Sequence, residues 1–463
     1  MKRALLVLTV LLIGACSPSA APSKHSTAAH LTGTIGKAAY EIQVPADWNG
    51  TLFLYSHGYV APDSTSNGAQ AVPDDKIRAW LLGRHFAVAG SAYSSSGWAI
   101  EDAFKDQIAL LDYFTTRAGK PKRVIAWGHS LGGIITAGLV QLYPDRFVGA
   151  MPMCGVLAGG VATWNLELDA AYAFKTLLAP TSDLQVVHIT KGSANLQLAE
   201  SIFTTAAQSP EGRARLALVA AMVDLPGWFD PTKPAPAATD FASVLQGQEI
   251  WESRADFPFA FQYRAELEAR AGGNPSWNEA VDYGQLLATS PNRDEVVALY
   301  RQASVDLNGD LRALNAGATI KADPVAAAYL ERFVSFDGHL QVPVLSVHTV
   351  GDGLVIPANE AAYASVVSAA DNGAMLRQVF VNRAGHCAFT PAETIAAFEA
   401  LLKRIDTGQW DEAALKPAPL NSAAADQRPG ASTIFGFSFD PSFVSYTPAK
   451  YPRPFARGQQ IPS

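Results

Sequence analysis

The chain has no cluster of basic residues and few cysteines. Its formal net charge is −7, and three of its 463 residues are cysteine. Nucleic-acid-binding proteins usually gather Lys and Arg on one surface, so we expect no nucleic-acid partner. Apart from Cys16, only Cys154 and Cys387 remain. In an oxidising compartment these two are a disulfide candidate, and the alternative is two separate buried thiols.

The apolar run at the N-terminus, Ala4–Ile13, is too short to cross a bilayer and follows the basic pair Lys2-Arg3. This pattern is typical of a signal peptide. The next residues, Ile13-Gly14-Ala15-Cys16, are similar to a bacterial lipobox. We therefore predict a lipoprotein signal peptide over residues 1–15 and lipidation of Cys16, with an ordinary signal peptide as the alternative. Residues 16–30 are small and polar, as in a flexible tether. The predicted location is the cell envelope, lipid-anchored to a bacterial membrane on its extracytoplasmic side, or secreted.

The remaining sequence divides into segments of different pattern. Residues 31–155 and 336–415 alternate between apolar strands and amphipathic helices, which predicts an α/β core with a mostly parallel sheet covered on both faces. Residues 156–335 are largely helical with no clear buried strand, so we expect a helical lid inserted into that core. Residues 416–463 are rich in Pro and aromatics and lack periodicity, which indicates an extended C-terminal tail.

A short glycine-rich turn, Gly128-His129-Ser130-Leu131-Gly132, lies between an apolar strand at 124–127 and a predicted helix at 132–143. A nucleophile elbow needs this strand-turn-helix context, because the turn is so tight that its flanking residues must be nearly free of side chain. The pattern predicts that Ser130 is a nucleophile.

A nucleophilic serine needs a histidine base, and the histidine needs an acid. Asp352 follows an apolar strand at 342–347, and His386 follows another at 376–381. We assign them as acid and base, although an ordinary turn aspartate and a structural loop histidine are the alternatives. Two competing histidines, His348 within a strand and His129 in the elbow, are interpreted as packed residues.

The same chemistry needs donors for an oxyanion. The backbone N–H after the nucleophile, here that of Leu131, usually supplies one. The other comes from a loop after an early strand, and a strand at 51–56 leads into His57-Gly58-Tyr59. We assign the second donor to the N–H of Tyr59, with Gly58 as the near alternative. Taken alone, this loop would be a simple turn.

The chain resembles the α/β-hydrolase superfamily, specifically its secreted esterase-like branch. Four segments carry the resemblance, in this order along the chain: Ser56-His57-Gly58-Tyr59, Trp127 to Gly133, Gly351-Asp352-Gly353 and Gly385-His386-Cys387. The resemblance runs from residue 31 to about 408, apart from the lid.

It implies an α/β-hydrolase fold with a mostly parallel eight-stranded sheet and a lid between strands 6 and 7. It also implies a triad of Ser130, His386 and Asp352, with no cofactor and no metal. Tannases and feruloyl esterases are looser relatives, because they place a Cys directly before the nucleophile, where this chain has His129. Since Cys387 follows the predicted base, a bridge to Cys154 would pin the histidine loop to the sheet.

The leading hypothesis is a carboxylic-ester hydrolase that acts through an acyl-enzyme on a small-molecule ester. We interpret the lid aromatics mainly as lid core; if they line the pocket, an aromatic or long-acyl ester follows. These aromatics are Trp228, Trp251, Phe257, Phe259, Phe261 and Tyr263.

One alternative is a proline-type serine exopeptidase. It would need a carboxylate cluster for the substrate amine, such as Glu249, Glu252 and Asp256, although such charges usually form a solvated helix face. A non-catalytic surface-binding lipoprotein is the other alternative. An Asp-rich segment at 306–310 lacks the later ligands of a calcium loop and is interpreted as a surface turn.

Overall fold

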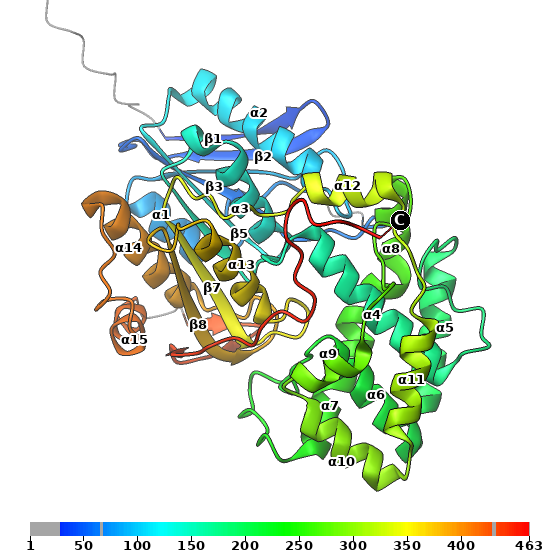
Figure 1. The fold of residues 1–463 in the computed structure, drawn as a ribbon. Coiled ribbons are helices and arrows are strands. Elements are labelled where there is room, and N and C mark those ends of the chain that lie inside the picture. The colour runs from blue at the N-terminus through cyan, green and yellow to red at the C-terminus, as the bar shows by residue number, and fades with distance from the viewer. Residues whose placement is uncertain (1–27, 65–67, 428–431, 463) are drawn as a thin grey trace, which may run out of the picture.

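The computed structural model describes residues 28–64, 68–427 and 432–462, and its centre is a nine-stranded sheet (Figure 1). The order across the sheet is β1-β2-β4-β3-β5-β6-β7-β8-β11. Strands β3 to β8 run parallel, whereas β1, β2 and β11 supply the antiparallel pairs at the two edges. The strands are β1 (Ala29–Ile35), β2 (Ala38–Val44), β3 (Thr51–Ser56), β4 (Ala87–Ser91), β5 (Arg123–His129), β6 (Gly149–Met153), β7 (Val344–Gly351), β8 (Leu376–Ala384) and β11 (Phe443–Val444).

The apolar strands are continuous in sequence because both faces of the sheet are covered. On β3, Leu52 and Leu54 face one hydrophobic core, whereas Phe53 and Tyr55 face a second core on the opposite side. The first core includes residues of α2 (Ile100–Ala118), α3 (Leu131–Leu142) and α13 (Ala358–Ala369). The second includes residues of α1 (Asp75–Gly83), α14 (Pro391–Thr407) and α15 (Pro417–Ala425).

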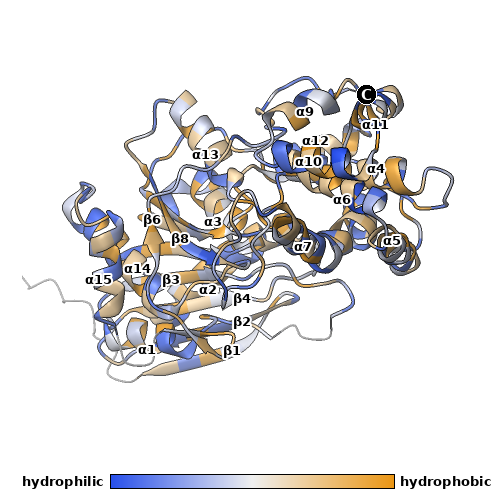
Figure 2. Cartoon of the chain, turned by 90° about the horizontal axis from the view of Figure 1, so that it is seen from below, coloured by the Kyte–Doolittle hydropathy of each residue, from blue (hydrophilic) through white to orange (hydrophobic). Residues whose placement is uncertain are grey.

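A group of helices lies between β6 and β7 in the chain and beside the sheet in space (Figures 1 and 2). It has a hydrophobic core of its own, in which Phe174, Leu218, Phe257 and Tyr300 are buried. The helices are α4 (Gly160–Leu178), α5 (Gly192–Ala206), α6 (Pro210–Met222), α7 (Phe241–Trp251), the π-helical turns η2 (Glu252–Asp256) and η3 (Pro258–Tyr263), α8 (Arg264–Ala271), α9 (Tyr283–Thr289), α10 (Arg293–Ala303), α11 (Leu307–Gly317) and α12 (Pro324–Arg332).

This arrangement confirms the predicted α/β-hydrolase fold and the lid between the sixth and seventh strands. The eight expected strands are joined by β11, which the C-terminal tail adds to the edge of β8. The segment at 306–310 is the start of α11, where Asp310 pairs with Arg215 at 2.9 Å, so it is a helix terminus and the surface-turn interpretation is wrong.

The tail is only partly extended. It begins with α15, and its hairpin of β9 (Thr433–Ile434) and β10 (Phe437–Ser438) precedes β11. The chain then crosses from the sheet to the lid, where Arg453 Nη1 contacts Asp169 Oδ2 at 2.8 Å and the Gly458 N–H donates to Glu331 at 2.6 Å (Figure 1). The tail therefore holds the lid against the sheet domain.

The predicted signal peptide and Cys16 lie outside the described residues, as does most of the predicted tether. Within the described part of the chain, every helix is too short or too polar to span a bilayer.

Candidate active site

Ser130 lies at a sharp turn between β5 and α3. Its backbone has φ 59° and ψ −123°, a region that non-glycine residues rarely adopt. The two flanking residues, Gly128 and Gly132, must be glycine because a side chain at either position would collide with a neighbouring backbone. A Cβ at Gly128 would lie 2.5 Å from the Ser56 carbonyl oxygen, and one at Gly132 would lie 1.9 Å from the same atom. This is the geometry of a nucleophile elbow.

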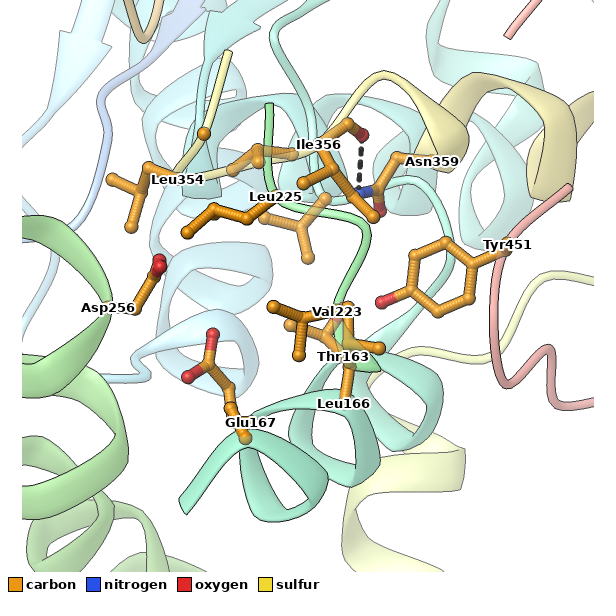
Figure 3. A pocket seen from close by; sticks show the side chains of 14 residues that line it. Thr163, Leu166, Glu167, Val223, Leu225, Asp256, Leu354, Ile356, Asn359 and Tyr451 are labelled. Carbon is orange, nitrogen blue, oxygen red and sulfur yellow. Dashed lines mark hydrogen bonds between the residues drawn. The ribbon is translucent and has the colours of Figure 1, made fainter. Parts of the chain in front are cut away.

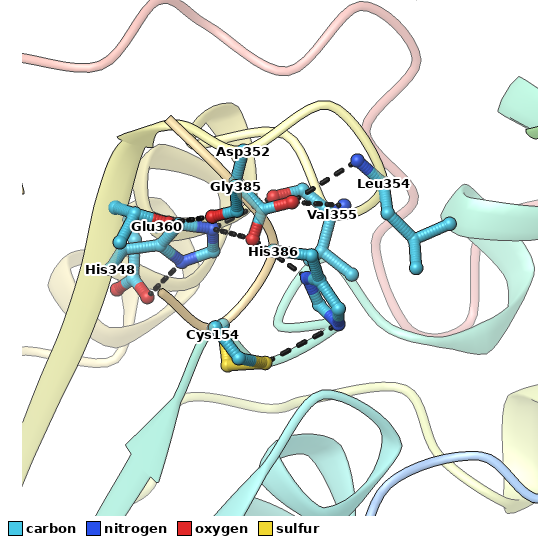
Figure 4. The surroundings of a disulfide bond; sticks show 10 residues. Cys154, His348, Asp352, Leu354, Val355, Glu360, Gly385 and His386 are labelled. Atoms are coloured by element: carbon cyan, nitrogen blue, oxygen red, sulfur yellow. Dashed lines mark hydrogen bonds and ion pairs between the residues drawn. A yellow bond between two sulfur atoms is a disulfide. The ribbon is translucent and has the colours of Figure 1, made fainter. Parts of the chain in front are cut away.

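Asp352 and His386 form a hydrogen-bonded pair beyond the ends of β7 and β8 (Figure 4). His386 Nδ1 lies 2.8 Å from Asp352 Oδ2, and the backbone N–H groups of Leu354 and Val355 donate to Oδ1 at 3.1 and 3.0 Å. Asp352 is fully buried. Since an ionised carboxylate only accepts hydrogen bonds, Nδ1 carries the proton and Nε2 is left with a lone pair. That nitrogen is the one that a base would use.

A disulfide between Cys154 and Cys387 brings the serine and histidine segments together. The Ser130 N–H donates to the Met153 carbonyl at 3.0 Å, and the next residue, Cys154, is bridged to Cys387 directly after His386. The Cys387 sulfur lies 3.3 Å from His386 Nε2. The structure has the two cysteines bridged, and Ser130, Asp352 and His386 all follow strands that end at the same edge of the sheet.

Behind Asp352 lies a second buried histidine, His348 on β7 (Figure 4). Its Nδ1 is 3.0 Å from Glu360, and its Nε2 is 2.8 Å from the Val355 carbonyl and 3.6 Å from Asp352. Burial lowers the pKa of His348, but the hydrogen bond to Glu360 and the charges of Glu360 and Asp352 outweigh it, so the pKa is raised.

Because both ring nitrogens face acceptors, the imidazolium is the form that satisfies them. His348 is packed, as expected, and it also contributes a positive charge beside the acid. Nothing in the strand pattern around it signals this contact.

The other elbow histidine, His129, packs among aromatic rings, as expected. Its ring lies 5.7 Å from that of Trp127 and 6.3 Å from that of Phe389. Burial, with a smaller effect from His386, lowers the pKa of His129 to about 4.

The loop after β3 runs beside Ser130. A Cβ at Gly58 would lie 3.3 Å from the Ser130 Cβ, so glycine allows this approach. His57 holds the loop, because its ring stacks on Tyr93 at 4.0 Å and its carbonyl accepts from the Tyr93 hydroxyl at 3.2 Å. Tyr59 lines the cavity in front of Ser130 together with Leu131. The backbone positions assigned as oxyanion donors are therefore close to the serine.

A cavity leads from Ser130 under the lid. It encloses about 410 Å³ of empty space, including the part open to solvent. Its lining is mostly apolar, as is common in ligand pockets. The cavity in front of Ser130 is lined by both parts of the molecule, with Tyr59, Trp98, Val156, Trp164, Phe259 and Leu354 among its residues.

The predicted lid aromatics divide between two roles. Trp251, Phe257 and Phe261 are buried in hydrophobic cores. Phe259, by contrast, lies in the cavity wall, and Tyr263 packs on Tyr59 at 5.4 Å between ring centroids. Trp228 donates from its indole N–H to the carbonyls of Asp230 and Lys233.

A neighbouring cavity continues from this one, and Figure 3 shows Glu167 of α4 and Asp256 of η2 pointing into it. Of the three lid carboxylates considered in the sequence, Glu249 pairs with Arg213 at 2.9 Å. Glu252 and Asp256 are 2% and 8% exposed, so their interpretation as a solvated helix face is wrong. Both belong to the π-helical turn η2, and both side chains are buried.

The chain is similar to known hydrolases in sequence. A model of the prolyl oligopeptidase family matches residues 89–175. The o-phthalyl amidase of Xanthobacter agilis is 30% identical over 450 residues, which cover 90% of this chain and 96% of that protein.

Among solved structures, an esterase from Aspergillus oryzae covers 83% of this chain and 80% of its own, at 14% identity and a TM-score of 0.41. Feruloyl esterase B from the same organism covers 82% of this chain and 80% of its own, at 14% identity and a TM-score of 0.37.

The sheet topology and the serine elbow define a serine hydrolase of the α/β-hydrolase class. The chain belongs to the α/β-hydrolase superfamily, in the family that includes the o-phthalyl amidase of Xanthobacter agilis.

Proposed function

We propose that this protein is an extracytoplasmic carboxylic-ester hydrolase that uses Ser130, His386 and Asp352 as its catalytic triad. The observation that carries the proposal is the buried Asp352–His386 hydrogen bond of 2.8 Å, beyond the strand ends where the Ser130 elbow also lies. Asp352 orients the imidazole and balances the charge that His386 gains.

The reaction begins when the Ser130 hydroxyl attacks the ester carbonyl and passes its proton to His386 Nε2. The carbonyl oxygen becomes an oxyanion, which the N–H groups of Leu131 and Tyr59 stabilise, with Gly58 as the near alternative. His386 returns the proton to the leaving alcohol, and an acyl-enzyme remains. A water molecule activated by His386 then attacks the acyl-enzyme and releases the acid.

The lining of the cavity supports a substrate with an apolar or aryl group. Trp98, Trp164 and Phe259 lie around the position in front of Ser130, and aromatic side chains provide large apolar contact surfaces. The proposed location, with Cys16 as a lipid anchor, rests on the N-terminal sequence.

A second candidate is amide hydrolysis, because the 30% identical relative is an o-phthalyl amidase. The same residues would act, with His386 protonating a leaving nitrogen in place of an oxygen. Rates on p-nitrophenyl butyrate and on the p-nitroanilide of the same acid separate the two. Activity on the anilide without activity on the ester would overturn the esterase proposal.

The nucleophile is tested with a fluorophosphonate probe. We expect the probe to label the wild-type protein and not Ser130→Ala, and we expect the substitution to lower ester turnover by on the order of 10⁴-fold or more. If the folded wild-type protein is not labelled, the proposed function is wrong.

A further inference from the structure

The cavity beyond Ser130 contains carboxylates that the proposed reaction does not use. Glu167 of α4 and Asp256 of η2 both line it and point into it (Figure 3). Asp256 is 8% exposed and its Oδ2 has no hydrogen-bond partner among the described residues. No hydrogen bond within the described part of the chain reaches the Glu167 carboxylate either. Glu167 is partly exposed, whereas an unpartnered buried acceptor such as Asp256 Oδ2 is costly, so a donor in this cavity would stabilise the site.

The surroundings of this pair are negative as well. Glu252, one turn before Asp256, is 2% exposed with neither carboxylate oxygen hydrogen-bonded in the described chain. Burial raises the pKa of Asp256, and the charges of Glu167, Glu252 and Asp352 raise it further. Burial also raises the pKa of Glu167 to about 7, against a lowering effect of Arg264. The charge that would relieve all of these groups is positive.

Arg264, the cation that acts on Glu167, has both terminal nitrogens engaged, whereas its Nε has no partner among the described residues. Its guanidinium is fully buried and donates to the Trp164 carbonyl at 2.9 Å and to Asn274 and Ser276 at 3.3 Å. It does not line the cavity. A negatively charged ligand would therefore meet carboxylates with no free cation to receive it, whereas a ligand ammonium would meet two acceptors.

We propose that Glu167 and Asp256 form a subsite that binds a protonated amino group of the substrate. The remaining walls are apolar, with Val156, Leu166, Leu225, Leu354 and Ile356 among them, so the ligand class is an amine carried on an apolar or aryl group. The two carboxylates accept N–H hydrogen bonds from the ammonium, and the adjoining cavity places the acyl carbon before Ser130. This assignment of substrate class rests on the proposed function.

The test compares three ligands that share one skeleton and differ in charge: 2-phenylethylamine, 2-phenylethanol and 3-phenylpropanoate. Their dissociation constants are measured by calorimetry at pH 8 on Ser130→Ala, so that turnover is not required. We expect the amine to bind at least ten times more tightly than the alcohol, and the carboxylate to bind weakest. Equal affinities, or tightest binding of the carboxylate, would overturn the proposal.

Two variants locate the effect. Adding Glu167→Gln or Asp256→Asn to Ser130→Ala should reduce the amine-to-alcohol affinity ratio at least tenfold. The ratio is internal to each variant, so a general loss of affinity cancels. The matched control is Asp224→Asn, whose carboxylate accepts from Ser290 and does not line this cavity, and it should leave the ratio unchanged. A ratio that persists in both cavity variants contradicts the assignment.

The outcome for the subsite is separate from the outcome for catalysis. If the fluorophosphonate probe fails to label Ser130 while amine binding depends on Glu167 and Asp256, the proposed function fails and the subsite stands. If labelling succeeds and the three ligands bind alike, the reverse holds.

Discussion

Buried carboxylates occur in both the sheet domain and the lid, but their surroundings differ. In the sheet domain each is surrounded by donors. Glu393 accepts from both terminal nitrogens of Arg383, at 2.7 and 3.0 Å, and from the N–H of Thr390, and Glu360 accepts from Ser346 and contacts His348.

In the lid, both oxygens of Glu252 and one oxygen of Asp256 are without partners among the described residues. Burial raises the pKa of Asp224 and of Glu295 to about 7. The lid can also satisfy an acid, since Asp169 accepts from Tyr283 and Arg453. The buried acids of the sheet domain thus stabilise the fold through hydrogen bonds, and one of them orients His386. The unpartnered acids of the lid lower the free energy of unfolding unless a ligand donates hydrogen bonds or positive charge to them.

The largest expected effect comes from removing the charge of Asp352. Asp352→Asn replaces an acceptor with an amide that can donate, which favours the wrong tautomer of His386. We expect kcat for p-nitrophenyl butyrate to fall by on the order of 10⁴-fold, with the fold retained.

The control is Asp371→Asn in the left-handed turn after α13, a conformation that Asn tolerates. It should leave kcat unchanged. A loss of less than tenfold in Asp352→Asn would show that Asp352 does not orient the base.

The next effect concerns stability. Arg383 and Glu393 are 2% and 0% exposed, and Glu393 also caps α14. Arg383→Met leaves the carboxylate buried without its cation, which should lower the free energy of unfolding by about 3–5 kcal/mol. Urea denaturation with the disulfide intact measures this.

Arg377→Met is the matched control, because Arg377 pairs with Glu412 at the surface. Exposed ion pairs contribute little, so we expect a change of about 0–1 kcal/mol. If Arg383→Met and Arg377→Met lower the free energy of unfolding by the same amount, the proposed difference between buried and exposed ion pairs is wrong.

The sequence was sufficient for the parts of the site that depend on local pattern. The elbow at Ser130 follows from five consecutive residues, and Asp352 and His386 follow from their places after two strands. The contact of His348 with Glu360 was not predictable, because it joins a strand to a helix through side chains that carry no motif.

The lid acids were misjudged for a different reason. The interpretation rested on the usual exposure of charged residues on a helix, but Glu252 and Asp256 belong to a π-helical turn, η2, that packs into the interior. Glu252 and Asp256 lie on the inward side of this segment, at 2% and 8% exposure. Phe257 and Phe261, four residues apart, share the face that enters the lid core, whereas Phe259 between them reaches the cavity.

The smallest expected effect has the opposite sign from the others. Glu252→Met replaces an unpartnered buried carboxylate with an apolar side chain of similar length, so it should stabilise the protein at pH 8 by about 1–3 kcal/mol. Burial raises the pKa of Glu252 above its ordinary value of 4.5, and the charges of Glu249 and Glu295 raise it further. The folded protein therefore holds this proton at pH values where the unfolded chain has lost it, and stability falls as the pH rises from 4.5 through the folded pKa.

Glu252→Met removes this pH-dependent loss of stability. The gain in its free energy of unfolding over the wild-type protein should therefore be small at pH 5 and larger at pH 8. Thermal unfolding at the two pH values measures the difference. Glu211→Met, which removes an exposed acid from the first turn of α6, should change stability by about 0.5 kcal/mol or less at either pH. If Glu252→Met destabilises the protein at pH 8, the carboxylate has a compensating donor and the lid acids resemble those of the sheet domain after all.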